Sequence, residues 1–118
     1  MSAGRPISKS EALLLISGWG SSAALIKVQC EVAPMAFSMQ GRVVELTALG
    51  RVRFLSIDGV SEFVFDIRDD FELVYTEPRD FPEEALTNVC ALGFFFSPRP
   101  EYASDKDFIL LSELIENP

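Results

Sequence analysis

The sequence predicts an α+β domain that is mainly β: an antiparallel meander of five to seven strands, curled or barrel-like, with a short N-terminal helix and a C-terminal helix. Two observations carry this prediction. Apolar and polar residues alternate over long stretches from residue 24 onward, which is typical of strands with one buried face. Turn-forming residues separate the apolar runs at spacings that suit antiparallel hairpins.

Length and composition limit the number of domains and the classes of partner that we expect. The chain has 118 residues, enough for one domain spanning residues 1–118, and 48% of them are hydrophobic, as in ordinary globular proteins. The net charge of −8 disfavours nucleic acid and anionic membranes as partners, because both would repel the surface. We find no credible signal sequence or transmembrane span, so a cytoplasmic location is the default expectation.

The N-terminal helix is predicted from a capping box. Ser8 is followed three residues later by Glu11, directly before the apolar run 12–16. We expect this helix to end at Gly18. Residues 13–16 are also compatible with a buried strand, because periodicity cannot separate the two structures in so short a run.

Residues 24–32 alternate as a half-buried strand that ends at Pro34. The residues that face inward continue on a second strand as far as Val43. Val44 and Leu46 lie at odd spacings from Val43, so simple alternation would place them on the other face. A bulge near Val43 and Val44 restores the face. The predicted inward residues are Ile26, Val28, Cys30, Val32, Phe37, Met39 and Val43.

The pair Asp58-Gly59 predicts a two-residue hairpin with a type I′ turn. This turn places Phe54 opposite Phe63, and Val52 opposite Phe65, on the inner face. On the outer face it pairs Arg51 with Asp66.

Two further loops extend the meander over about residues 42–76. A loop at 48–50 places Val44 opposite Phe54, and Glu45 opposite Arg53 on the outer face. A loop at 68–70 predicts a further hairpin, in which the strand that begins at Phe71 pairs with the strand that precedes the loop. The residue pairs expected from that loop are Ile67 with Phe71, Phe65 with Leu73, and Phe63 with Tyr75.

The last third of the chain combines a strand with helical patterns. Residues 91–96 form a predicted buried strand, and Pro82 followed by two glutamates suits the first turn of a helix. The C-terminal segment is predicted to be a helix that covers the sheet, because its apolar residues fall on one arc of a helical projection. This arc consists of Phe108, Leu110, Leu111, Leu114 and Ile115.

No catalytic motif stands out. The chain has no histidine, which excludes imidazole bases and histidine-ligated metals, and its two cysteines, Cys30 and Cys90, are compatible with free thiols or with one disulfide. Acidic residues gather around one predicted turn, where they suit either a metal or acid–base site or a solvated loop. This acidic cluster is Asp66, Asp69, Asp70 and Glu72. We expect no metal and no cofactor, and an enzyme working on carboxylates is the third hypothesis.

Arg42, Arg51 and Arg53 are the candidate ligand-binding residues, because guanidinium groups bind anions such as phosphate in a bidentate manner. The predicted register also places Arg51 and Arg53 opposite acids. Cross-strand ion pairing is therefore the competing interpretation of these arginines.

Residues 41–50 resemble the motif of PilZ domains, in which an Asp or Asn is followed by Ser two residues later and Gly three after that. Glu45, Thr47 and Gly50 stand at these positions, and the family's upstream pair of arginines is absent. PilZ domains are small β-barrels that bind cyclic di-GMP. The resemblance implies a small barrel, and we do not extend it to the nucleotide.

Four apolar residues are candidates for a protein interface: Trp19, Val64, Val74 and Phe95. Trp19 lies between two glycines, where it suits either an exposed anchor or a core residue. The other three are predicted on the outer face of the sheet. The leading hypothesis is a non-catalytic interaction or regulatory module that self-associates, as a homodimer, or binds another protein. The alternative is a small β-barrel, distantly PilZ-like, that binds an anion or nucleotide.

Overall fold

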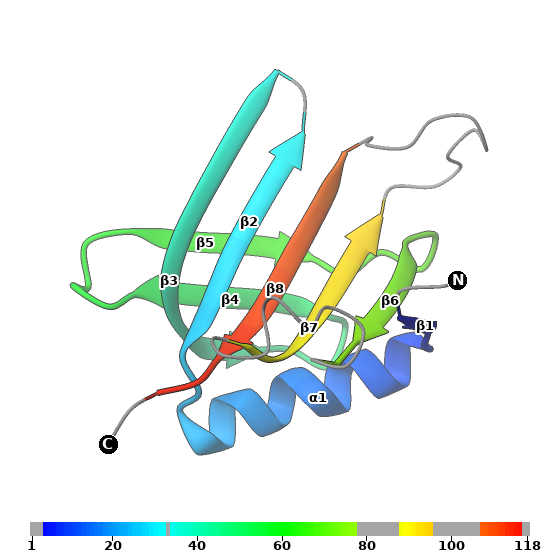
Figure 1. The fold of residues 1–118 in the computed structure, drawn as a ribbon, viewed down its shortest axis with the longest axis horizontal. Coiled ribbons are helices and arrows are strands. Elements are labelled where there is room, and N and C mark those ends of the chain that lie inside the picture. The colour runs from blue at the N-terminus through cyan, green and yellow to red at the C-terminus, as the bar shows by residue number, and fades with distance from the viewer. Residues whose placement is uncertain (1–3, 33, 78–87, 96–106, 117–118) are drawn as a thin grey trace.

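The computed structural model describes residues 4–32, 34–77, 88–95 and 107–116. Within these residues, eight strands form one antiparallel sheet in the order β1-β6-β7-β8-β2-β3-β4-β5, with the helix α1 packed against it (Figure 1). The elements are β1 (Arg5–Pro6), α1 (Lys9–Ser22), β2 (Ile26–Val32), β3 (Met35–Leu46), β4 (Arg51–Ser56), β5 (Glu62–Asp66), β6 (Glu72–Thr76), β7 (Asn88–Phe95) and β8 (Phe108–Leu114).

The sheet curls at Gly41, in the middle of the twelve-residue strand β3. Gly41 is opposite Ile26 of β2 on one side and Ser56 of β4 on the other. A Cβ atom at Gly41 would lie 2.2 Å from the carbonyl oxygen of Leu55, so only glycine fits there. Beyond this point β4 and β5 run behind β2 and β8 (Figure 1). The sheet is therefore curled, as predicted, but it is not closed into a barrel.

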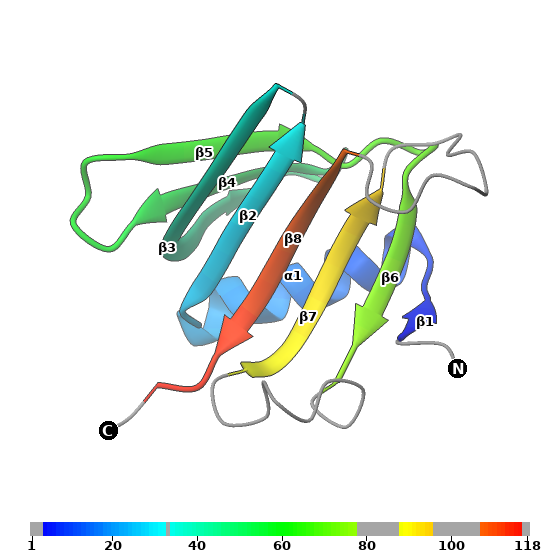
Figure 2. The same cartoon turned by 45° about the horizontal axis from the view of Figure 1, so that its top comes forward.

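The capping box predicted for the N-terminal helix is present. Ser8 Oγ accepts a hydrogen bond from the backbone N–H of Glu11, and the Glu11 carboxylate accepts one from the backbone N–H of Ser8. The helix continues past the predicted end at Gly18 to Ser22, and Ala23 ends it in the left-handed conformation. In Figure 2 the helix lies behind β7 and β8, on the side of these strands where β4 also lies.

The core lies between the two halves of the curled sheet and α1. One cross-strand row runs from Tyr75 through Leu92, Leu111 and Val28 to Met39, and its three middle residues are fully buried. Aromatic rings join the two halves, since Phe65 of β5 meets Phe94 of β7 edge to face with centroids 5.2 Å apart. The alternation predicted for residues 24–32 is confirmed by the buried side chains of Ile26 and Val28.

The predicted pairing of β4 with β5 is confirmed. Phe54 is opposite Phe63, and Arg51 is opposite Asp66. The predicted bulge in β3 is confirmed as well, because the register shifts between Val43 and Glu45. Val43 therefore takes the place opposite Phe54 that was expected for Val44, whose side chain is 52% exposed.

The type I′ turn predicted at Asp58-Gly59 is wrong. Gly59 has a positive φ of 75°, whereas Asp58 does not belong to the described residues with positive φ. The backbone N–H of Gly59 instead donates to the carbonyl oxygen of Ser56 at 2.9 Å, so the turn begins one residue earlier. The register is unaffected, because the longer loop keeps Ser56 opposite Ser61.

The predicted pairing of residues 62–67 with residues 71–75 is also wrong. β5 forms one end of the sheet, whereas β6 lies near the other end, between β1 and β7. Leu73 is opposite Phe94 instead of Phe65, and Tyr75 is opposite Leu92 instead of Phe63. Because the sheet curls, residues 67–71 carry the chain from one end of the sheet to the other, and no hairpin forms there.

The predicted C-terminal helix is wrong, since residues 108–114 form the central strand β8, and within the described ranges the sheet has eight strands instead of five to seven. β8 pairs with β2 and β7, and buried side chains on both of its faces obscure the strand alternation. The predicted buried strand at 91–96 corresponds to β7, which ends at Phe95 within the described residues. The helix start predicted at Pro82 lies outside the described residues.

Candidate functional site

The three arginines proposed for an anion site are each bound by acids. Arg51 donates two hydrogen bonds to Asp66, of 2.8 and 3.1 Å, which hold the pKa of that carboxyl below its usual value. Arg53 lies 3.1 Å from Glu45 and 3.7 Å from Glu62. These contacts match the cross-strand pairing that the register predicted.

Arg42 is turned away from the other two arginines, toward the end of β8. Its guanidinium donates two hydrogen bonds to the Glu116 carboxylate, of 3.2 and 3.0 Å, and one to the backbone carbonyl of Ala23. The hydrogen bonds from Arg42 lower the pKa of Glu116. Arg42 thus holds the segment after β8 against the end of α1, and it does not join Arg51 and Arg53 in one anion site.

Of the residues that carry the PilZ-like pattern, Glu45 lies in β3, whereas Thr47 and Gly50 lie in the turn between β3 and β4. Thr47 Oγ1 accepts a hydrogen bond from the backbone N–H of Arg51 at 3.0 Å. Gly50, with a φ of 103°, donates its N–H to the carbonyl oxygen of Thr47. Glu45 pairs with Arg53 of β4, so each of the three matched residues has a structural role.

The acidic cluster predicted at the turn after β5 is divided among separate cations. Asp66 pairs with Arg51, Asp69 pairs with Lys9 at 2.8 Å, and Asp70 pairs with Arg68 at 2.6 Å. Within the part of the chain that the structure describes, no group of three or more potential metal ligands comes together.

Trp19 is in the core and only 3% exposed, so it matches the core interpretation instead of the exposed anchor. Its indole Nε1 donates to Glu113 Oε1 at 2.9 Å, and the Cys90 thiol lies 3.6 Å from the same oxygen. Burial, followed by the charge and hydrogen bond of Glu113, raises the pKa of Cys90 to about 12. Cys90 and Cys30 are both free thiols, and the high pKa makes Cys90 a poor nucleophile.

The face of the sheet opposite α1 carries two of the proposed interface residues. Val74 and Phe95 are half-buried, and Phe95 packs against Phe108 with ring centroids 6.1 Å apart. Gly93 precedes Phe95 on the same face, and a Cβ there would lie 2.9 Å from the Phe95 ring. The ring therefore covers the glycine, which reduces the apolar surface that this face exposes.

Val64, the remaining interface candidate, is 42% exposed and lies at the centre of the end strand β5. Just outside β5, the carbonyl oxygen of Ser61 accepts a hydrogen bond from the backbone N–H of Ser56 in β4, and the backbone N–H of Ile67 donates to the carbonyl oxygen of Gly50, directly before β4. Because backbone groups alternate in direction along a strand, those of Glu62, Val64 and Asp66 point away from β4. No strand among the described residues pairs with this outer edge of β5.

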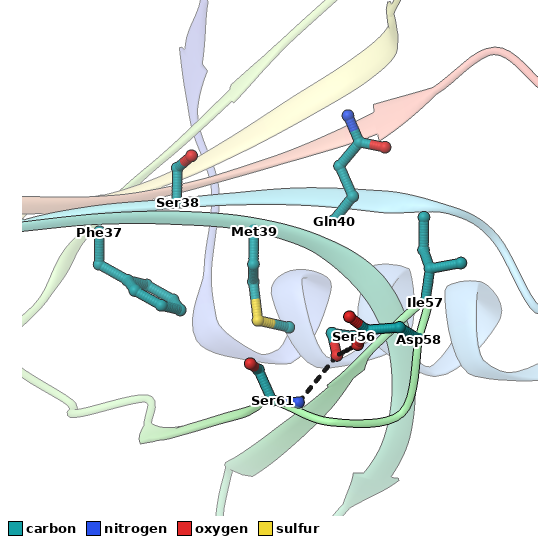
Figure 3. Close-up of a pocket in the computed structure, with 8 residues that line it drawn as sticks. All are labelled: Phe37, Ser38, Met39, Gln40, Ser56, Ile57, Asp58 and Ser61. Atoms are coloured by element: carbon teal, nitrogen blue, oxygen red, sulfur yellow. Dashed lines mark hydrogen bonds between the residues drawn. The ribbon is translucent and has the colours of Figure 1, made fainter.

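A pocket of about 360 Å³ lies between the first half of β3 and the turn that joins β4 to β5 (Figure 3). In Figure 3 the side chains of Phe37 and Met39 point into the space toward Ser56 and Ser61, whereas Ser38 and Gln40 of the same strand point away. Eight residues line the pocket: Phe37, Ser38, Met39, Gln40, Ser56, Ile57, Asp58 and Ser61.

From the sequence, Asp58 is predicted only as a turn residue, and Phe37 and Met39 only as inward-facing residues of a strand. The alternation did place Phe37 and Met39 on the inner face, where they lie opposite Cys30 and Val28. The inner face is open at this end because β3 bends at Gly41, and a glycine in the middle of a strand is the sequence signal that could have indicated this bend. Phe37 consequently remains 40% exposed.

Comparison of the chain with protein-family models, with curated proteins and with solved structures finds no match. No helix in the described part of the chain has the length and apolar character needed to cross a membrane.

Proposed function

We propose that this protein is a non-catalytic interaction module that associates with a second copy of itself through the outer edge of β5. The single observation that carries the proposal is the unpaired backbone of Glu62, Val64 and Asp66 at the end of the sheet. Such an edge offers donors and acceptors in the spacing that another strand needs.

The side chains along this edge suit a symmetric contact. In an antiparallel pairing of two β5 strands about Val64, the two valines face each other and Glu62 faces Asp66 of the second copy. Repulsion between these acids is reduced, because Arg53 lies 3.7 Å from Glu62 and Arg51 lies 2.8 Å from Asp66. Exposed apolar residues in the preceding turn extend the contact surface, since Ile57 is 62% and Val60 is 83% exposed.

The non-catalytic part of the proposal is supported by the polar groups of the described residues. Asp66, Asp69 and Asp70 are held by arginines or a lysine, and the free thiol of Cys90 is buried against Glu113. Neither arrangement provides an acid, base or nucleophile in a cleft, as general acid–base or nucleophilic catalysis requires.

The test is the mass of the particle in solution as a function of protein concentration, measured by light scattering after gel filtration. Val64→Pro removes the outward N–H and leaves the hydrogen bonds between β4 and β5 in place, so it should abolish the dimer. Val64→Thr keeps that N–H and the β-branched shape, so it should dimerise like the native protein. A native protein that remains monomeric at every concentration, or a Val64→Pro variant that still dimerises, contradicts the proposal.

A further inference from the structure

We propose that the pocket between β3 and the β4–β5 turn binds a small organic cation, an amine that carries an apolar body. The pocket lining does not include Glu62, Val64 or Asp66 of the outer edge of β5, although Ile57 belongs both to the lining and to the proposed contact surface. Its volume of about 360 Å³ is within the range of small-molecule sites.

The two walls of the pocket differ in chemistry (Figure 3). Phe37 and Met39 supply an aromatic ring and a thioether from β3, and Ser56, Asp58 and Ser61 supply polar groups from the turn. The Phe37 ring is held in place by Phe63, against which it stacks with centroids 5.6 Å apart and an interplanar angle of 17°. A ligand in this space would therefore contact an ordered apolar wall and a carboxylate at the same time.

Asp58 is fixed in position and charged. Its Oδ1 accepts hydrogen bonds from Ser56 Oγ at 2.6 Å and from the backbone N–H of Val60 at 3.0 Å. These bonds lower the pKa of Asp58, the one from Ser56 contributing most. Among the described residues no cation pairs with this carboxylate, in contrast to Asp66, Asp69 and Asp70.

A cation completes this arrangement better than a neutral or anionic ligand does. An ammonium group can donate to Asp58 while its positive charge lies near the face of an aromatic ring. The net charge of −8 also attracts cations and repels anions at long range. Phe37 and Met39 then exclude water from the apolar part of the ligand.

Three probes of similar shape test the charge requirement: benzylamine, benzyl alcohol and benzoate. Each is titrated into isotopically labelled native protein while backbone amide resonances are recorded. We expect benzylamine to give saturable shifts centred on residues 37–40 and 56–61, with an affinity at least about tenfold higher than that of the neutral alcohol, and benzoate to give none. Equal binding of benzylamine and benzyl alcohol, or shifts centred elsewhere, overturns the proposal.

Asp58→Asn tests the carboxylate, because the amide oxygen can still accept the hydrogen bonds from Ser56 and Val60. Glu31→Gln is the matched control, since it removes one exposed negative charge from β2 that is not part of the pocket lining, on the strand face opposite to that of Cys30 and Phe37. Benzylamine should bind Asp58→Asn at least about tenfold more weakly, while Glu31→Gln stays close to the native protein. Unchanged binding by Asp58→Asn contradicts the proposal.

If Asp58→Asn is not folded, Phe37→Leu provides the second variant, because it removes the aromatic face and retains an apolar side chain. It should weaken benzylamine more than benzyl alcohol, and equal weakening of the two overturns the proposed contact with the cation. Val64→Pro should bind benzylamine like the native protein, so a failure of self-association and a failure of this site give different results.

Discussion

The indole Nε1 of Trp19 donates a hydrogen bond to Oε1 of Glu113 at 2.9 Å, which joins α1 to β8 across 94 positions of the chain. The same oxygen lies 3.6 Å from the Cys90 thiol of β7. The partly buried carboxylate of Glu113 therefore connects the helix α1 to the strands β7 and β8. Sequence spacing gives no indication of this contact, because each partner lies on a different element.

Trp19→Phe should lower the free energy of unfolding by about 1.5–3 kcal/mol, because it removes the donor to Glu113 and keeps an aromatic ring in the core. The measurement is urea denaturation followed by circular dichroism, since the variant lacks the tryptophan fluorophore. Glu113→Gln retains an acceptor oxygen and should cost less than Trp19→Phe. A smaller loss for Trp19→Phe than for Glu113→Gln would argue against the hydrogen bond as the stabilising contact.

Gly41→Ala should prevent folding or destabilise the protein by several kcal/mol, because its Cβ would lie 2.2 Å from the backbone oxygen of Leu55. Gly18→Ala in α1 is the matched control. A Cβ at Gly18 meets nothing within 4 Å, so this change should stabilise the protein by about 0.5–1 kcal/mol. Thermal unfolding of both variants checks the pair, and a Gly41→Ala protein of native stability would contradict the bend described here.

Arg51→Gln should make the stability less dependent on pH under acidic conditions. Hydrogen bonds from Arg51 lower the pKa of Asp66 from 3.8, so this pair stabilises the folded state above that pH. The stabilisation is lost as the pH falls through the lowered pKa, and the variant has less of it to lose. Titration of the Asp66 carboxyl by NMR checks the cause, because the pKa should return toward 3.8 in Arg51→Gln.

Cys90 should react slowly with alkylating agents as long as the protein is folded, because its pKa is raised to about 12 by burial and by Glu113. The sign for stability follows from the same shift. The unfolded thiol ionises near 9.0, so stability is retained below that pH and lost as the pH rises toward 12. Urea midpoints across this range provide the measurement, and Cys90→Ala should reduce the alkaline loss, although Tyr75 still contributes because its pKa is also raised to about 12.

Local patterns were informative wherever a strand has one buried face. Alternation placed Ile26 and Val28 in the core, and the same pattern set Phe54 opposite Phe63. A shift of one residue would have moved these side chains to the other face, so the register follows from the sequence. The Ser8 and Glu11 capping box is similarly local, because both partners lie within one helical turn.

The candidate sites were less accessible to sequence analysis. Pairing of Arg51 with Asp66 followed from the register, whereas the contact of Arg42 with Glu116 joins distant parts of the chain. The pocket was not predicted, since Phe37 and Asp58 come together only through the curl of the sheet. The turn residues near the pocket predicted a loop, but they gave no indication that a pocket lies beside this loop.

Amino-acid patterns alone thus account for the mainly β class, the N-terminal helix, and the register from β3 to β5, because each depends on neighbours in the chain. The folded chain as a whole sets the strand order. It places β8 at the centre, where burial on both faces hides the alternation, and it separates β5 from β6 by curling the sheet at Gly41. The open edge at Val64 and the pocket at Asp58 are both results of that curl, since long-range packing, and not local spacing, determines which strands meet.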